Sequence, residues 1–255
     1  MTEPQRITSR DNPLLKRLRL LARDNTAHRK WGQVWLEGDH LCRALLARGG
    51  TPTLAVFCES NMDLSLGGYL SSATKKIIVS DTLMRDISGL ESAAAMGFVV
   101  ELPPATVVDT TAPTVVLDRV QDAGNVGSIL RSASAFGYTQ VLALKGTAAL
   151  WSPKVLRAGM GAHFGLRLME GVLPPVVATL AVPVLVTSSH QGEWVHRAAL
   201  PWPCAWVMGH EGQGVSAEIL AGDVHPIRIA QPGGEESLNV AAAAAICLHA
   251  SAAKP

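Results

Sequence analysis

Two glycine-rich turns in the last quarter of the chain have residue types that suit ligand binding. The first covers residues 209–214 (GHEGQG), and the second covers residues 232–234 (PGG) and leads into an alanine-rich segment. Glycine lets a ligand approach the backbone closely, and the start of a helix offers free N–H groups. A third segment, residues 118–131, ends a predicted strand and begins a predicted helix. Together these segments predict a ligand-binding site.

Several common catalytic motifs do not match. Residues 159–165 (GMGAHFG) contain one residue too many for the dinucleotide fingerprint and follow a predicted helix, whereas that fingerprint follows a strand. The chain has no G-x-x-x-x-G-K-[ST] phosphate loop and no G-x-S-x-G nucleophile elbow. Its histidines and four cysteines show no spacing typical of metal ligands. We therefore expect no serine hydrolase and no metal, and we expect reduced, buried cysteines.

The composition predicts a packed globular protein. The 255 residues are 48% hydrophobic and only 17% charged, which fits one large or two small domains. The first ten residues (MTEPQRITSR) contain no apolar segment, so no signal peptide is expected. The longest apolar run, near residues 174–187, is broken by Pro183 and is too short to cross a bilayer. These features predict a cytoplasmic protein.

Positive charge is concentrated at the N-terminal end. Residues 1–48 hold ten Lys/Arg against five Asp/Glu, although the whole chain has a net charge of +1. A helix predicted over residues 12–24 carries Arg17 and Arg19 on its outer face, and residues 28–35 combine Arg29 and Lys30 with two tryptophans. This mixture suits stacking and phosphate contacts with RNA. The alternative for the basic residues is a solvated helix face, and Trp35, on the strand that follows, is expected in the core.

Short elements alternate in the first hundred residues. Helices are predicted at 40–47 and 81–87, and strands at 54–58, 76–79 and 97–101. This order predicts a small α/β domain over residues 1–103. Proline-containing residues 104–113 predict a linker.

From residue 114 onward the pattern predicts a parallel α/β domain, residues 114–255. Strands are expected at 114–118, 140–144, 184–187, 205–208 and 227–229, and helices at 125–136, 153–158, 216–221 and 237–250. The strands are almost continuous runs of Val, Ile and Leu, as in a sheet that is buried on both faces. Ligands bind beyond the carboxyl ends of such strands, where the unusual loops 118–125, 187–192, 209–214 and 230–237 lie.

Three segments of this second domain resemble family motifs. Asn125-x-Gly127-x3-Arg131 is similar to the first motif of the SpoU/TrmH family of RNA 2′-O-ribose methyltransferases, within the SPOUT superfamily. Residues 207–216 (VMGHEGQGVS) and 237–241 (SLNVA) resemble the second and third motifs, in the family's order and at family-like spacing. The N-terminal domain resembles the L30e-like substrate-binding domain of many members through residues 7–9, Asn12 and residues 36–38.

The resemblance implies a fold, a methyl donor and an assembly. The second domain would be a SPOUT-type parallel α/β domain whose C-terminal part is threaded into a trefoil knot, and the protein would be a homodimer. The donor would be S-adenosylmethionine. The positions that match its binding residues, largely through backbone groups, are Gly209, Ile229, Leu238 and, less directly, Thr187.

The resemblance also assigns a catalytic centre. The matching residues are Arg131, Asn125, Glu211, Ser237 and Asn239. Arg131 would activate the ribose hydroxyl, either as a base or, more easily for a guanidinium with a pKa above about 12, by stabilising the developing alkoxide. Structural alternatives are a helix cap for Asn125 and Ser237, loop N–H binding for Glu211, and an ion pair for Arg131.

The chain departs from the family pattern at two places. Ala123 replaces a common proline, and residues 229–232 (IAQP) replace the commoner Ile-Pro-Met. We expect methylation of a ribose 2′-hydroxyl in RNA, with ribosomal (23S-type) RNA favoured because members that act on tRNA often carry only short extensions. The alternatives are a tRNA ribose methyltransferase and a non-catalytic RNA-binding or ribosome-assembly protein.

Overall fold

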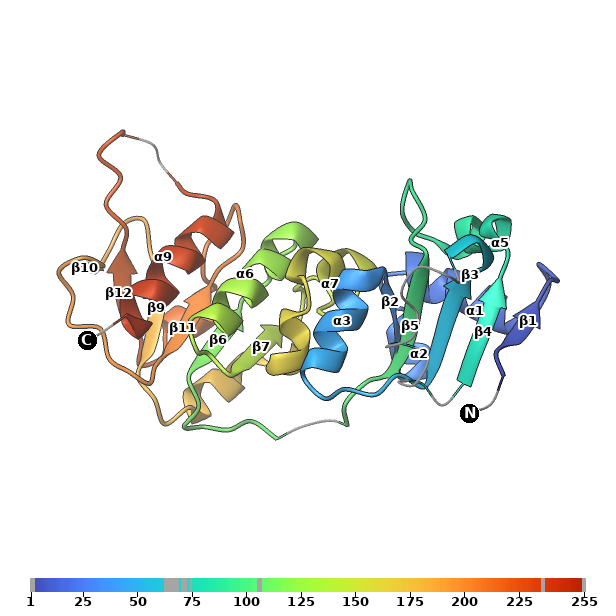
Figure 1. The fold of residues 1–255 in the computed structure, drawn as a ribbon. Helices are drawn as coiled ribbons and strands as arrows, with labels where there is room; N and C mark the ends of the chain where they lie inside the picture. Colours follow the sequence, from blue (N-terminus) through green and yellow to red (C-terminus); the bar gives the residue numbers. More distant parts are fainter. Residues whose placement is uncertain are drawn as a thin grey trace. The chain divides into compact units, whose positions relative to one another are not determined.

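The fold comes from a computed structural model, which describes residues 3–61, 69, 73, 75–104, 107–234 and 237–253 (Figure 1). The chain forms two compact units. The first comprises Met1–Pro104 and Trp151–Phe164, and the second comprises Ala105–Leu150 and Gly165–Pro255. The sequence predicted a first domain that ends near the same place, but it assigned all of residues 114–255 to the second domain. Trp151–Phe164 belongs to the first unit instead, because its helix α7 (Pro153–Gly159) packs on α1 (Pro13–Arg23) and β2 (Gln33–Glu37).

The first unit is built on a five-stranded mixed sheet in the order β1-β4-β3-β5-β2. Its strands β1, β4 and β3 are parallel, while β5 is antiparallel to both of its neighbours. The strands are β1 (Gln5–Ile7), β2 (Gln33–Glu37), β3 (Leu54–Cys58), β4 (Lys75–Val79) and β5 (Met96–Glu101). Around the sheet are α1 (Pro13–Arg23), α2 (Ala27–Trp31), α3 (Asp39–Ala47) and α5 (Asp81–Ile87).

The predicted amphipathic helix is α1. Asn12 caps it by accepting a hydrogen bond from Leu14 N through Oδ1 at 2.9 Å. Leu15, Leu18 and Leu21 are buried in one core cluster with Trp35, of which only 3% is exposed. Trp35 is therefore a core residue, as expected from its place on a strand.

The second unit contains a seven-stranded sheet in the order β10-β12-β9-β11-β6-β7-β8, in which every pair is parallel. The predicted parallel sheet is confirmed. Its strands are β6 (Thr114–Leu117), β7 (Gln140–Leu144), β8 (Arg167–Val172), β9 (Val184–Thr187), β10 (Glu193–Trp194), β11 (Ala205–Met208) and β12 (His225–Arg228). The two strands that the sequence did not reveal, β8 and β10, form the two edges.

Helices cover both faces of this sheet. On one face, α6 (Ala123–Ala135) and α9 (Val240–Ala252) pack against each other, as Figure 1 shows. Trp206 of β11 faces α9, and its Nε1 donates to Ser251 Oγ at 2.9 Å. On the other face, Val177 of the 3₁₀ helix η3 (Pro174–Thr179) and Ile219 of α8 (Ala217–Leu220) pack on valines of the central strands.

The predicted linker is partly fixed to the second unit. The buried side chain of Gln140 accepts from Asp109 N at 2.9 Å and donates to Asp109 O at 3.1 Å. It also donates to Thr114 Oγ1 at 2.9 Å. The chain that precedes β6 is therefore held at the sheet from Asp109 onward, whereas residues 105–106 lie outside the described part.

Two helices begin elsewhere than predicted. Asp122 caps α6 by accepting from Asn125 N at 2.8 Å, so the structural alternative, in which Asn125 is the cap, is wrong. Ala123 is the first residue of α6, a position that also accommodates proline, so this departure from the family pattern is compatible with the turn. Asn239 caps α9 by accepting from the N–H groups of Ala241 and Ala242, so Ser237 is not the cap.

Among the described residues, no helix has the length and apolar character needed to cross a membrane. The four cysteines are free and buried, as expected. The trefoil knot stays a prediction.

Gly97 of β5 offers a test of packing in the first unit. A Cβ at this position would lie 2.3 Å from the Trp35 ring, so Gly97→Ala should lower the free energy of unfolding by roughly 1–3 kcal/mol. Trp35→Phe removes the ring atoms involved, so the double variant should lose less stability than the sum of the single losses. Urea unfolding of all four proteins measures this coupling, and additive losses would contradict the contact.

Candidate functional site

Three of the predicted catalytic residues form one hydrogen-bonded cluster. Asn125 Nδ2 donates to Glu211 Oε1 at 3.1 Å. Asn239 Nδ2 donates to Asn125 Oδ1 at 2.9 Å. Asn125 lies in α6, Glu211 in the turn after β11, and Asn239 at the cap of α9, so residues far apart in the sequence meet at the carboxyl edge of the sheet. The sequence motifs therefore identify residues that converge in space.

Glu211 fastens the loop before α6. Its carboxylate accepts from Gln121 N at 3.1 Å and from Asp122 N at 3.0 Å, in addition to the Asn125 amide. Burial by itself raises the pKa of this carboxyl, but these N–H donors outweigh it and lower the pKa to about 2. Glu211 is therefore ionised at neutral pH. It does bind loop N–H groups, as the structural alternative proposed, but they belong to a different loop from its own.

Asp118 and Arg119 form a second connection between the same two loops. Asp118 is 1% exposed, and its Oδ2 accepts from Ser216 N at 2.6 Å while Oδ1 pairs with Arg119 Nε at 3.0 Å. Arg119 Nη1 donates to Gln213 Oε1 at 2.8 Å. Neither residue is among those predicted from the sequence. The position of Asp118 directly after a buried apolar strand could have identified it as a candidate. The left-handed backbone of Arg119 (φ 62°) could not be predicted from the sequence, because residues other than glycine seldom adopt it.

Gly209 is required by the shape of its own turn. A Cβ at Gly209 would lie 2.3 Å from Gly214 C and from Val215 N. The turn is closed by paired backbone hydrogen bonds between His210 and Gly214, at 3.0 and 2.8 Å. His210 Nδ1 accepts from Gly212 N at 3.0 Å. Gly209 therefore allows the backbone at the start of the turn to lie close to the backbone at its end. This close approach fixes the position of Glu211 within the turn.

The predicted cofactor residues follow neighbouring strands. Thr187 ends β9, Gly209 follows β11 and Ile229 follows β12, and β9 lies between the other two. Thr187 Oγ1 donates to Val207 O at 3.3 Å, which ties β9 to β11 at this edge. Ile229 is half-buried, and Leu238, next to Asn239, is 41% exposed. Apolar side chains are thus available to a ligand here, whereas Glu235 and Glu236 lie outside the described residues.

Arg131 and Ser237 do not join the hydrogen-bonded cluster. Both side chains are exposed, and neither forms a hydrogen bond or ion pair with any residue in the part of the chain that the structure describes. The ion pair weighed as an alternative for Arg131 is therefore not found there. Its guanidinium remains available to a substrate or to another chain.

The predicted RNA-binding cations have different surroundings. Arg19 pairs with Asp86 and donates to Arg10 O at 2.9 Å, so it holds the first unit together. Arg17 is half-buried. Arg29 and Lys30 are exposed, and Lys30 Nζ lies 4.9 Å from the centroid of the Trp31 ring. Arg29 and Lys30 are therefore better placed than Arg17 and Arg19 to meet a partner.

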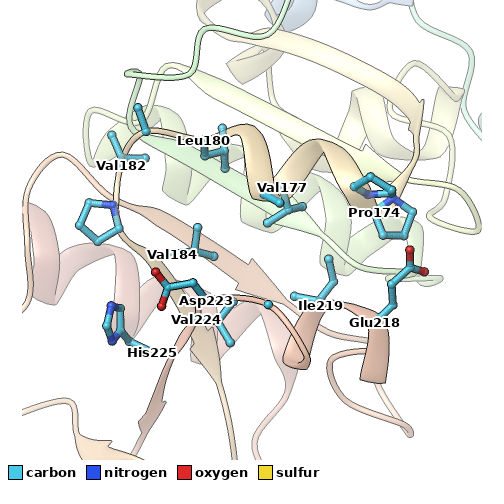
Figure 2. Close-up of a pocket in the computed structure, with 15 residues that line it drawn as sticks. Pro174, Val177, Leu180, Val182, Val184, Glu218, Ile219, Asp223, Val224 and His225 are labelled. Carbon is cyan, nitrogen blue, oxygen red and sulfur yellow. The ribbon is translucent and has the colours of Figure 1, made fainter.

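A cavity in the second unit lies away from this site. Its volume is about 430 Å³, and η3, α8 and the first residues of β9 and β12 line it (Figure 2). Val177, Val184 and Ile219 supply its apolar floor, and Glu218 and Asp223 its carboxylates. It is found at the amino ends of β9 and β12, whereas the clustered residues follow the carboxyl ends of the strands. None of the predicted site residues lines it.

No group of His, Cys, Asp and Glu that could hold a metal ion occurs among the residues described by the structure.

Known proteins resemble this chain in sequence and in fold. The model of the SpoU rRNA Methylase family matches residues 112–249. An uncharacterized tRNA/rRNA methyltransferase of Synechocystis is 32% identical over 259 residues, or 95% of this chain and 92% of that protein. The 23S rRNA (guanosine(2553)-2'-O)-methyltransferase RlmP of Bacillus subtilis is 29% identical over 84% of this chain and 86% of its own length.

Solved structures share the fold of the whole chain. An RNA 2'-O ribose methyltransferase matches with a TM-score of 0.80 at 26% identity, over 97% of this chain and 98% of that chain. An AdoMet-bound rRNA methyltransferase from Sinorhizobium meliloti matches with a TM-score of 0.83 at 23% identity, over 97% of each chain. At the latter identity the likeness concerns the fold alone.

The hydrogen bonds of Glu211 make the stability of the protein depend on pH. Because folding lowers the pKa from 4.5 to about 2, the carboxylate stabilises the fold above pH 4.5, and this contribution is lost as the pH falls toward 2. Glu211→Gln should lower the free energy of unfolding by roughly 1 kcal/mol at pH 7, and the deficit should shrink at pH 3. Urea unfolding at both pH values measures it. Glu218→Gln, an exposed glutamate on α8, is the control, and a deficit that does not change with pH would refute the assignment.

Proposed function

We propose that this chain, which belongs to the SpoU rRNA methylase family, methylates a ribose 2′-hydroxyl of RNA with S-adenosylmethionine as the donor. The observation that carries this proposal is the cluster of Asn125, Glu211 and Asn239. It brings all three family motifs together at the carboxyl edge of a parallel sheet, where ligands of such folds bind.

The edge formed by β12, β9 and β11 fits the adenosyl part of the donor. Ile229, Thr187 and Gly209 follow these strands in spatial order, and the exposed Leu238 offers an apolar surface for a purine ring. The donor, when bound, supplies a methyl group that its sulfonium charge already activates. The residues of the chain then have to orient the acceptor hydroxyl and deal with its proton.

Orientation is the task that the cluster suits best. Each asparagine amide carries two N–H hydrogens, and Asn125 and Asn239 each use one within the cluster. One N–H of each amide is left for an oxygen of the RNA. Holding two reactants in line is worth up to roughly 7–11 kcal/mol in well-aligned systems, so a rigid pair of amides is a substantial contribution.

Arg131 is the group that we assign to the developing alkoxide. A guanidinium keeps its proton at neutral pH, so it stabilises negative charge more readily than it accepts a proton. Glu211 is an equally poor base, because its pKa of about 2 leaves little affinity for a proton. The proton of the hydroxyl therefore passes to water as the C–O bond to the methyl group forms and the C–S bond of the donor breaks.

We further propose a homodimer whose catalytic centre is completed by a second copy. Arg131 and Ser237, although in family motifs, do not reach the cluster among the described residues of one chain. Ile246 on α9 is 40% exposed, which leaves an apolar side chain on the outer surface of this helix. A second subunit would cover it and bring the missing groups.

We favour ribosomal RNA as the substrate and the cytoplasm as the location. The Bacillus relative is named for methylation of 23S rRNA, and the first unit, as an L30e-like domain, presents Arg29 and Lys30 to an anionic partner. A tRNA substrate and a non-catalytic ribosome-assembly role are the alternatives. Mapping 2′-O-methyl sites in total RNA from cells with and without this protein decides among them, since a site lost from tRNA, or no site lost, would overturn the favoured substrate.

Arg131→Ala should lower kcat by about 100-fold or more, because the alkoxide loses its nearest cation. Its Kd for S-adenosylmethionine, measured by calorimetry, should stay within about threefold of the parent value. Arg167→Ala removes an exposed arginine of β8 and should leave both quantities unchanged. Normal turnover by Arg131→Ala would eliminate its role.

Reversal of charge at Arg29 and Lys30 should weaken RNA binding and flatten its dependence on salt. Each lost phosphate contact lowers the slope of log K against log salt by about 0.7–0.9. Filter binding with a 23S rRNA transcript at several salt concentrations measures the slope. Lys75→Glu, at an exposed position on β4, is the control. An unchanged slope in the double variant would mean that this basic surface is only solvated.

A further inference from the structure

A cluster of one cation and two aromatic side chains lies at the edge of the second sheet. Arg228, the last residue of β12, pairs in register with Trp194 of the edge strand β10. The guanidinium carbon of Arg228 lies 4.0 Å from the centroid of the Trp194 ring. The His196 ring stacks on Trp194 at 6.5 Å with an interplanar angle of 25°. None of these three residues belongs to the hydrogen-bonded catalytic cluster.

Backbone geometry fixes this cluster in place. Arg228 Nε donates to Gly192 O at 3.1 Å. Gly192 has a φ of 103°, and a Cβ there would lie 1.8 Å from Pro226 O, so the loop before β10 is held tightly against β12. The guanidinium is therefore oriented before any ligand arrives, which reduces the entropy that binding must cost.

The cluster also has unused binding capacity. The two Nη groups of Arg228 make no hydrogen bond or ion pair with any residue within the described ranges. Arg228 and Trp194 are half-buried, while His196 is exposed. Flat, ordered rings and a guanidinium with free N–H groups are thus accessible together at one surface.

These groups select nucleic acid by their chemistry. Bases stack on aromatic rings and on guanidinium planes, and free guanidinium N–H groups bind phosphate oxygens. His190 and Arg197 are exposed on the same segment, where Glu193 is the one acidic residue between them. An acidic protein surface would engage Arg228 but would gain little from the stacked rings.

The position of the cluster relates it to the proposed reaction. Trp194 and Arg228 lie at the carboxyl ends of β10 and β12, the same edge of the sheet at which Thr187 ends β9 and Gly209 follows β11. Neighbouring strands are about 4.8 Å apart, so β10 lies roughly 14 Å from β11. A nucleotide on the cluster would flank a ribose held at the catalytic centre, not replace it.

We propose that Trp194, Arg228 and His196 form a subsite for a nucleotide that flanks the methylated ribose. The base of this nucleotide stacks on the aromatic–guanidinium surface, and the Nη groups of Arg228 bind its phosphate. The subsite rests on the proposed function, since its ligand is the RNA substrate, and it adds a contact in the second unit that determines how the RNA is aligned.

The test uses Trp194→Leu, which keeps apolar bulk but removes the ring, and Arg228→Gln. Binding of a 23S rRNA transcript is measured by filter binding at several salt concentrations. Both variants should raise the Kd by about tenfold. Arg228→Gln should also flatten the slope of log K against log salt concentration by the amount expected for one lost phosphate contact. Trp194→Leu should leave this slope unchanged, because stacking releases no counterions. A structural role alone would not produce this difference between the two variants.

Trp202→Leu is the control, because Trp202 (44% exposed) precedes β11 and so lies at the amino ends of the strands, away from the cluster. It should bind the transcript as the parent does. The Kd for S-adenosylmethionine should match the parent in all three variants, and thermal unfolding checks that each variant is folded at the temperature of the binding assay. His196→Ala provides a milder change of the same surface if Trp194→Leu fails to fold.

Two outcomes would overturn the subsite. One is a Kd within twofold of the parent value for both Trp194→Leu and Arg228→Gln. The other is a loss confined to Arg228→Gln, which would indicate a purely electrostatic contact. RNA binding does not require turnover. A parent protein that binds the transcript without methylating it would therefore contradict the proposed function. The subsite would still be tested by the Kd values of the variants relative to the parent.

Discussion

The proposed catalytic cluster depends on the interaction of one carboxylate with the backbone of another loop. Glu211, in the turn after β11, accepts from the N–H groups of Gln121 and Asp122 in the loop after β6. Since β6 and β11 are neighbours in the sheet, both loops leave it side by side. The Glu211 bonds fix the place where α6 begins, and with it the amide of Asn125, which in turn positions Asn239 at the start of α9.

Three further residues, Gly209, Asp118 and Arg119, hold the turn that carries Glu211. Gly209 allows the turn that carries Glu211 to close, while Asp118 anchors the far side of that turn through Ser216 N. Arg119, which has a left-handed backbone, donates a hydrogen bond to Gln213 in the same turn. A rigid turn of this kind can hold hydrogen-bond donors in place before a substrate binds. The donors then need no reorganisation during the reaction.

Much of the second sheet was predictable from the sequence, because its inner strands are apolar runs buried on both faces. The edge strands were not, since β8 is half-exposed and β10 has only two residues. The starts of α6 and α9 were not predictable either. Asp122 and Asn125, like Ser237 and Asn239, are equally good caps in isolation, and tertiary contacts decide between them. Motif resemblance identified Asn125, Glu211 and Asn239, whereas Asp118 and Arg119, which hold the loops, emerged only from their contacts.

The two units differ in charge in a way that fits an RNA substrate. Residues 105–150 and 165–255 hold seven Lys/Arg against ten Asp/Glu, so the unit with the catalytic cluster is net acidic. General attraction to RNA must then come from the first unit, where Arg29 and Lys30 are exposed. In the second unit we propose defined positions for two cations instead, Arg131 at the catalytic centre and Arg228 beside Trp194.

The central claim is that the Glu211 carboxylate builds the catalytic centre by holding the loop before α6. The most direct test is the single-turnover rate of 2′-O-methyl formation by Glu211→Gln at pH 7, with saturating RNA and S-adenosylmethionine and below the unfolding temperature of the variant. Displacement of a catalytic group by about 1 Å can cost about 100-fold in rate, so the account predicts a loss of that size with the donor still bound. A rate within twofold of the parent rate would contradict it.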